Sequence, residues 1–375
     1  MSVREGRPVV IHVSTAHRAN DVRIFERECR SLAATGQYQV YLAASGAIPE
    51  RGAVMHIPLA PAPNTRVRRF SSGPRKALAM ARSLDADLWH FHDPELLPVA
   101  FMLARSGQRV IWDAHEDYVA QIAQGDDKSW VPGPARHAVR AGTKQLLAAV
   151  DNYAAAVIAA TPTIAAHYSN KRTVVVGNEA RLEDFMGGTP DFASRRVLFT
   201  GHVGHSHLFP EVVEAIRGLR DVKLAVAGSE PSPEIWNESR NVLGDRIEYL
   251  GWLNPEGLAH AMSGSSLGLA LYAPIPTYLT SDGSPTKVFE FGAAGLPVLG
   301  SPIPSVTRIL GEWRCGFVTA GFTSQDIRIA IHAALADRAA WEEASDQGRD
   351  RAMRDGGWAQ SEAELLRVYR QILGV

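Results

Sequence analysis

Residues 281–295 read Ser-Asp-Gly-Ser-Pro-Thr-Lys-Val-Phe-Glu-Phe-Gly-Ala-Ala-Gly, a pattern that predicts the beginning of a helix. Ser284 suits the N-cap and Pro285 suits the first helical position. Lys287 then falls in the first turn, where the positive end of the helix dipole disfavours a cation. We therefore expect an anion beside Lys287. Phosphate is the obvious candidate, because the free amides of helix N-termini bind it.

Three side chains of the predicted helix project from one face, since Glu290 follows Lys287 by three residues and Thr286 by four. Asp282 lies before the helix, where a glycine turn could fold its carboxylate over the same pocket. The alternative is a solvated helix with Lys287 and Glu290 as a surface ion pair. The small residues at 292–295 count against that alternative and predict an internal helix.

The run at residues 284–298, Ser-Pro-Thr-Lys-Val-Phe-Glu-Phe-Gly-Ala-Ala-Gly-Leu-Pro-Val, resembles the donor-site signature of the retaining GT-B glycosyltransferases. This family includes sucrose synthases and many bacterial polysaccharide and antibiotic glycosyltransferases. It carries two acidic residues eight apart, of which Glu290 matches the second. The first is usually Glu and is here the shorter Asp282.

The resemblance implies a nucleoside diphosphate sugar as donor. It places Glu290 on the ribose hydroxyls and Asp282 on the sugar, and counts both among the catalytic residues. Thr286, Lys287 and the helix amides would bind the diphosphate, and Ser284 is a further donor-binding residue. Gly228, at the end of another predicted strand, completes the glycines expected around the donor.

The loop Gly201-His202-Val203-Gly204-His205-Ser206-His207 departs from the family, which has an Arg after the glycine and a Lys five residues beyond it. His202 and His207 stand at those positions, and histidine carries only part of a positive charge near pH 7. Either both become protonated beside the diphosphate, or Lys287 and the amides of Gly204 and the helix supply most of the stabilisation. A histidine metal site is the other alternative, but a glycine-containing loop beside a phosphate site favours the first account.

The whole chain has 375 residues and 46% hydrophobic content, which indicates two globular α/β domains. Lys and Arg outnumber Asp and Glu by 21 to 16 up to Ala180, and the remainder has 18 against 24. Cys29 and Cys315 are too few for a disulfide framework or a cysteine metal site. We see no signal peptide and no apolar stretch long enough to cross a bilayer, so the cytoplasm is the expected compartment.

Short apolar strands alternate with loops and helices in both halves of the chain, a pattern typical of two doubly wound, Rossmann-like domains. Residues 1–180 are expected to form the acceptor-side domain and residues 181–355 the donor domain. A last helix within residues 356–375 should cross back onto the first domain, as the GT-B fold implies.

Loops after the strand ends of the first half carry the candidate acceptor-side residues, because ligands bind there in such sheets. The acceptor-side candidates are His17, Asp21, Glu116 and Asp117. The segments Asn-Asp-Val-Arg-Ile-Phe, Phe-His-Asp-Pro-Glu-Leu-Leu and Asp-Ala-His-Glu-Asp resemble a bacterial branch of the same family. His115 matches the histidine that these enzymes place beside the transferred sugar, and the resemblance counts it, with Asp282 and Glu290, among the catalytic residues.

Two acidic motifs of the first half are interpreted as structural. Asp93 begins a Asp-Pro-Glu run typical of a helix start, and His92 is assigned to the same structural role. Asp85 and Asp87 superficially match a metal-binding acidic pair, but they lie at the sheet end opposite the ligand loops. We predict no metal site and no cofactor beyond the co-substrate.

Six basic residues and no acidic one lie in the segment from Arg66 to Arg82. Such a cluster can bind anionic lipid on the inner face of the membrane, and a solvated loop with a basic helix face is the alternative. Phe70 is the single aromatic residue of the segment, which argues against nucleic-acid binding.

The resulting hypothesis is a retaining, metal-independent glycosyltransferase that moves a sugar, with UDP-sugar favoured, to a hydroxyl acceptor. The departing phosphate would take the acceptor proton, so no enzyme nucleophile is required. The alternatives are a sugar-nucleotide epimerase of the same architecture and a catalytically inactive, donor-binding partner subunit.

Overall fold

The computed structural model divides into two compact units, Met1–Gly177 with Ser361–Val375, and Asn178–Gln360. This division lies three residues before the boundary expected from the sequence at residue 180. The C-terminal segment joins the first unit from Ser361 onward. The structure describes residues 6–50, 52–61, 66–115, 136–181, 184–185, 188–280, 285–355 and 357–375.

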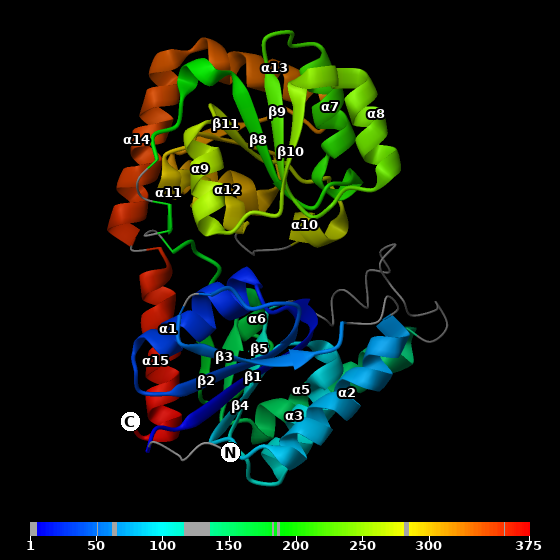
Figure 1. Ribbon diagram of the computed structural model, residues 1–375, viewed down its shortest axis with the longest axis vertical. Coiled ribbons are helices and arrows are strands. Elements are labelled where there is room, and N and C mark those ends of the chain that lie inside the picture. The colour runs from blue at the N-terminus through cyan, green and yellow to red at the C-terminus, as the bar shows by residue number, and fades with distance from the viewer. Residues whose placement is uncertain are drawn as a thin grey trace. The chain divides into compact units, whose positions relative to one another are not determined.

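A seven-stranded parallel sheet forms the first unit, and its order changes direction between β1 and β4 (Figure 1). The strand from Val9 is longer than predicted, because the chain pairs again with β2 at Arg18 after an irregularity. The edge strand β3 was not predicted from the sequence. In sheet order the strands are β3 (Val54–Leu59), β2 (Gln39–Ser45), β1 (Val9–Arg18), β4 (Leu88–Phe91), β5 (Val110–Ala114), β6 (Ala156–Ala159) and β7 (Thr173–Val175).

Helices cover both faces of this sheet (Figure 1). Helices α2, α3 and α5 lie together on one face, and α1 and α15 lie on the other. The hydroxyl of Ser31 in α1 donates a hydrogen bond to the carboxylate of Glu362 in α15, which ties the C-terminal helix to this unit. The helices of the first unit are η1 (Val22–Cys29), α1 (Arg30–Ala34), α2 (Arg66–Ser83), η2 (Pro94–Leu96), α3 (Leu97–Arg105), α5 (Arg136–Tyr153), α6 (Pro162–Ala165) and α15 (Trp358–Leu373).

A six-stranded parallel sheet forms the second unit and changes direction between β8 and β11. In doubly wound sheets, ligands bind at the carboxyl ends of the strands beside such a change. The predicted doubly wound fold is confirmed in both units. In sheet order the strands are β10 (Ile247–Gly251), β9 (Lys223–Gly228), β8 (Arg196–Gly201), β11 (Leu267–Ala270), β12 (Val298–Gly300) and β13 (Gly316–Val318).

The helices of the second unit also form two layers, with α7, α8 and α13 in one and α9, α11, α12 and α14 in the other (Figure 1). Nowhere in the described residues does a helix have both the length and the apolar character needed to cross a bilayer. The helices are η5 (Phe192–Ser194), η6 (His205–His207), α7 (Phe209–Arg217), α8 (Pro233–Leu243), η7 (Gly244–Arg246), α9 (Pro255–Ser263), α10 (Pro276–Thr280), α11 (Thr286–Ala294), α12 (Pro304–Trp313), α13 (Ser324–Ala336) and α14 (Arg338–Asp355).

Both faces of the second sheet are buried, which explains why its strands are almost uniformly apolar. Val197 and Phe199 of β8 join the core under α7 and α13, whereas Leu198 between them faces the core that contains Val288 and Phe291 of α11. Helix α11 is therefore held against the sheet, and its N-terminus has a fixed position relative to the end of β8.

Candidate active site

Lys287 lies in the first turn of α11 and is almost fully buried. Its Nζ atom donates a hydrogen bond to the carbonyl oxygen of Thr200 on β8, at 2.7 Å. The ammonium also lies 5.5 Å from the ring centroid of Phe199 and 5.1 Å from that of Tyr272. Burial lowers the pKa of Lys287 to about 8, while the neighbouring Glu290 opposes this shift. The cation is thus held at the carboxyl end of β8, where a bound anion would stabilise its charged form.

The helix that carries Lys287 begins one residue later than predicted, since Pro285 is the N-cap and Thr286 the first helical residue. Pro285 makes no side-chain capping hydrogen bond. The first amides of a helix have no intrahelical acceptor, so those of Thr286 and Lys287 can serve an anion.

The internal position predicted for this helix is confirmed, and the solvated-helix alternative is wrong. Both Lys287 and Glu290 are only 9% exposed, and every residue of α11 after Thr286 is buried. Glu290 follows Lys287 along the same helix, and its ribose contact remains a prediction. Asp282 and Ser284 lie outside the described residues.

Two glycines bring the ends of β8 and β9 together. Gly201 and Gly228 are paired in register, with positive φ angles of 101° and 149°. A Cβ atom at Gly228 would lie 2.0 Å from the carbonyl oxygen of Gly201, a separation that no side chain can adopt. Gly204 has an extended backbone, with φ of 176°. The glycines therefore leave open backbone at the strand ends, next to Lys287.

His202 and His207 lie in the loop that follows β8, with their ring centroids 5.9 Å apart. The Nδ1 atom of His207 lies 3.1 Å from the hydroxyl of Ser206. The ring of His207 also packs against two tyrosines that the sequence reasoning missed, with centroids 5.2 Å from Tyr272 and 6.1 Å from Tyr278. The structure therefore brings His207 close to the aromatic ring that contacts Lys287.

Burial raises the pKa of Tyr272, and the neighbouring Tyr278 adds to the shift. Tyr272 therefore stays a neutral hydroxyl that can donate a hydrogen bond. The two rings lie 5.0 Å apart in an edge-to-face arrangement. This pair could offer an apolar wall and a hydroxyl donor to a ligand at the strand ends. No sequence signal marked it, because isolated tyrosines after a strand are common.

In the first unit, a buried carboxylate organises the loop after the central part of β1. One oxygen of Asp93 accepts hydrogen bonds from the amides of Thr15 (2.6 Å) and Ala16 (3.0 Å) and from the hydroxyl of Ser14 (2.9 Å). The other oxygen lies 2.8 Å from Nδ1 of His17. Burial opposes the charged form, but these hydrogen bonds, above all that of His17, lower the pKa of Asp93 well below its ordinary range.

The helix-start interpretation of Asp93 is therefore incomplete. Asp93 occupies the N-cap position of η2, but its carboxylate makes no capping hydrogen bond there. The side chain is directed toward β1 instead. By contrast, Asp87 has the structural role expected of it, since its carboxylate accepts a hydrogen bond from the amide of Val9 at the start of β1.

His115 follows β5 and is partly buried, with its ring edge-on to His17 at 5.1 Å between centroids. Its Nδ1 atom lies 3.6 Å from Asp113. Asp113 also forms a two-point ion pair with Arg23 (2.8 and 3.0 Å) and contacts Nδ1 of His92 at 3.0 Å. Burial disfavours the charge of Asp113, but Arg23 and the histidines lower its pKa well below the ordinary range. Asp113 thus stays ionised and can orient His115 as a hydrogen-bond donor.

The structure brings the acceptor-side candidate His17 next to the catalytic candidate His115, and the roles of both remain predictions. Asp21 has a different role, because its carboxylate caps η1 by accepting hydrogen bonds from the amides of Arg23 (2.9 Å) and Ile24 (3.0 Å). Glu116 and Asp117 lie outside the described residues. Arg23 of η1 and Asp113 of β5 stand in two of the quoted motifs, but nothing in the sequence showed their pairing across 90 positions.

Comparisons with known proteins agree with this architecture. Residues 194–337 match the family described as "Glycosyl transferases group 1". No curated protein sequence matches the chain.

Several solved structures share the fold of the whole chain. Sucrose-phosphate synthase from Thermosynechococcus elongatus aligns with a TM-score of 0.74 at 18% identity, covering 98% of this chain and 100% of that one. Anabaena HepE, solved in complex with UDP-glucose, aligns with a TM-score of 0.70 at 11% identity, covering 97% and 100%. WaaG, a glycosyltransferase involved in lipopolysaccharide biosynthesis, aligns with a TM-score of 0.72 at 13% identity, covering 96% and 99%. The chain therefore shares the GT-B fold of these structures, and residues 194–337 of its second unit match the group 1 glycosyl transferase family.

Proposed function

We propose that this protein is a retaining glycosyltransferase that moves a sugar from a nucleoside diphosphate sugar to a hydroxyl acceptor. The observation that carries the proposal is the placement of Lys287. A buried ammonium, two helix amides and two obligatory glycines converge at the carboxyl end of β8. A diphosphate is an anion of the size and charge that such a site stabilises. UDP-sugar is the favoured donor, in keeping with the structure of HepE with UDP-glucose.

In this proposal, Lys287 and the first-turn amides of α11 neutralise the diphosphate as it leaves. Glu290 accepts hydrogen bonds from the ribose hydroxyls, and Asp282 contacts the sugar. His202 and His207 add positive charge when they are protonated. The bond between the anomeric carbon and the diphosphate breaks while the acceptor oxygen bonds to the same carbon on the same face. The departing phosphate takes the acceptor proton, so catalysis rests on charge stabilisation and positioning without a metal.

The first unit would supply the acceptor side, with His115 beside the transferred sugar and His17 next to it. Asp113 lies 3.6 Å from Nδ1 of His115, and Asp93 orients the His17 ring through a 2.8 Å contact with its Nδ1. The acceptor belongs to the class of glycans, glycolipids and hydroxylated natural products.

A thermal-shift screen across nucleoside diphosphates and their sugars tests the proposal. A donor present at 100 times its dissociation constant should stabilise the protein by about 2.7 kcal/mol. Incubation with the matching donor alone should then give slow hydrolysis and no interconverted sugar. Interconversion would instead indicate an epimerase. Binding without any hydrolysis or transfer would indicate the inactive, donor-binding subunit. If no nucleotide stabilises the protein, the proposal fails.

We also propose that helix α2 contacts anionic lipid at the inner face of the membrane. Arg75 and Arg82 are exposed on this helix, whereas Ala77 and Met80 between them pack into the core. The protein should co-sediment with phosphatidylglycerol vesicles at low salt and release as ionic strength rises, because the Debye length shrinks to about 8 Å near 0.15 M. The double variant Arg75→Gln, Arg82→Gln should sediment less. Equal sedimentation with and without lipid would contradict this proposal.

A further inference from the structure

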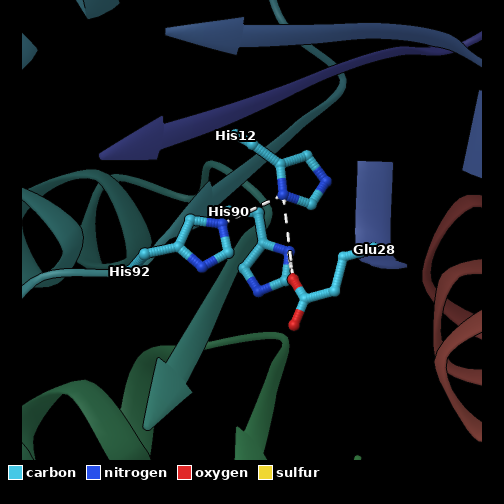
Figure 2. A group of neighbouring side chains, drawn as sticks. All are labelled: His12, Glu28, His90 and His92. Atoms are coloured by element: carbon cyan, nitrogen blue, oxygen red, sulfur yellow. Dashed lines mark hydrogen bonds and ion pairs between the residues drawn. The ribbon is translucent and has the colours of Figure 1, made fainter. Parts of the chain in front are cut away.

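Four fully buried side chains of the first unit converge on one point (Figure 2). His12 of β1 and His90 of β4 are register partners on adjacent strands, so their rings lie side by side on one face of the sheet. His92 follows two residues after His90, and Glu28 approaches from η1. One nitrogen or carboxylate oxygen from each residue lies within 4.8 Å of the others.

Hydrogen bonds within the described chain satisfy His12 and His92 but leave Glu28 and one nitrogen of His90 without hydrogen-bond partners. Neither carboxylate oxygen of Glu28 accepts a hydrogen bond from a described residue, and Nε2 of His90 has no such partner either. Arg23 forms an ion pair with Glu28 at 3.3 Å but directs its two-point hydrogen bonds to Asp113. Buried polar atoms without partners are rare in folded proteins, and a bound ion is one of their established causes.

The converging atoms have the spacing of a tetrahedral ligand set. Nδ1 of His12 lies 3.0 Å from Nε2 of His92 and 3.9 Å from Oε2 of Glu28. Nδ1 of His90 also lies 3.9 Å from Oε2 of Glu28. Zinc–ligand bonds of about 2.0–2.1 Å in a tetrahedron place the ligand atoms about 3.4 Å apart. The three separations given above each differ from this value by roughly half an ångström, and all four ligand atoms lie within 4.8 Å of one another, so the cluster would need to contract around an ion.

The other ring nitrogens of His92 and His12 already have the partners that metal-bound histidines require. Nδ1 of His92 lies 3.0 Å from the carboxylate of Asp113, and Nε2 of His12 lies 3.1 Å from the hydroxyl of Tyr369. Carboxylates and hydroxyls in these positions fix the tautomer and orientation of a ligating imidazole. Tyr369 also lies 2.7 Å from Nδ1 of His90, so its hydroxyl hydrogen must turn away when His90 becomes the fourth ligand.

We propose that His12, Glu28, His90 and His92 bind one divalent transition-metal ion of the zinc class as a structural site. Three imidazoles and one carboxylate suit such an ion, and four protein ligands leave no open position for substrate. The site would join β1, β4 and η1 and, through Tyr369, hold α15 against them. This inference goes beyond the proposed function, and it departs from the prediction of no metal site that the sequence supported.

Metal analysis of the full-length protein tests the site. Because all four side chains are buried, the ion should be taken up as the chain folds, so the protein is expressed in zinc-supplemented medium and assayed by inductively coupled plasma mass spectrometry. One equivalent of zinc is expected, released to a chromophoric chelator only on denaturation. The isosteric variant Glu28→Gln should lose the ion. Tyr369→Phe should bind it about 10- to 100-fold more weakly, as expected for loss of a supporting hydrogen bond.

A matched control comes from the second histidine group of this unit, formed by His17, Asp93 and His115. His17→Gln should keep the full equivalent of zinc. Near-ultraviolet circular dichroism establishes that each variant is folded. If Glu28→Gln fails to fold, the wild-type protein expressed with Co²⁺ still tests whether the site binds a metal. A four-coordinate site of histidines and a carboxylate gives Co²⁺ intense visible absorption.

Three results would overturn the proposal. The first is folded wild-type protein without stoichiometric metal, which would leave the cluster as a hydrogen-bonded core. The second is zinc retained by folded Glu28→Gln. The third is zinc lost from His17→Gln, which would move the site to the partly exposed group.

Discussion

Replacing Lys287 by methionine separates the donor-binding role of this residue from its structural one. Methionine keeps the length and apolar stem that pack beside Phe199 and Tyr272 but cannot donate a hydrogen bond or carry charge. A hydrogen bond to a charged group contributes about 1.5–3 kcal/mol. The dissociation constant of UDP measured by calorimetry should therefore rise about 10- to 150-fold.

The stability of the ligand-free protein should respond differently. The pKa of Lys287 is about 8 in the folded protein against an ordinary value of 10.5, so its charge opposes folding below pH 8. This penalty, of order 3 kcal/mol, fades and stability rises as pH increases from about 8 to about 10.5. Lys287→Met removes the penalty but leaves the Thr200 carbonyl without its donor, which costs about 1–3 kcal/mol. The two effects nearly cancel, so Tm at pH 7 should change little.

Lys223→Met is the matched control, because Lys223 is exposed at the opposite end of β9. It should leave both UDP affinity and Tm unchanged. Unchanged UDP affinity in Lys287→Met would refute the assignment of Lys287 to the diphosphate. A large fall in Tm with unchanged affinity would make Lys287 a purely structural residue.

Three further predictions concern the second unit. Glu290→Gln should weaken donor binding by roughly 1.5–3 kcal/mol in calorimetry while the protein stays folded, and unchanged affinity would exclude the ribose role. If His202 and His207 supply counter-charge to the diphosphate, kcat should fall as pH rises through the pKa values of these histidines. Replacing them by Arg and Lys should remove this alkaline fall in kcat. A wild-type kcat that does not change from about pH 6 to 9 would contradict the assignment. Gly228→Ala should lower the free energy of unfolding by roughly 1–3 kcal/mol or more, because the added Cβ atom would lie 2.0 Å from a backbone oxygen. The control Gly142→Ala should not lower Tm, because a Cβ atom at residue 142 has no other atom within 4 Å.

Local patterns in the sequence predicted most of the strands, most of the helices and the site helix α11. Lys287 was recognisable because a cation in the first helical turn conflicts with the helix dipole. Its partner was not recognisable, since the carbonyl of Thr200 lies 87 residues away and any backbone offers a carbonyl. The π-helical winding of residues 22–29 and the edge strand β3 also have no distinctive local pattern.

The first-unit clusters show why site chemistry was harder to predict than fold. Asp93 precedes a proline and has the sequence of a helix cap, yet its side chain binds residues 14–16 within β1, 77 to 79 residues earlier. His12 and His90 each interrupt an apolar strand, and that interruption was the available signal. Their meeting depends on the register of β1 with β4, which the sequence does not specify.

The placement of Tyr369 has a consequence for synthesis of the chain. This tyrosine contacts His12 and His90, yet the ribosome adds it only after the entire second unit. At about 5–20 residues per second, roughly 10 to 40 s separate Gly177 from Tyr369. During that interval, α15 does not yet cover the face of β1 and β4 in the nascent first unit. A growing polypeptide therefore completes its second unit before its first.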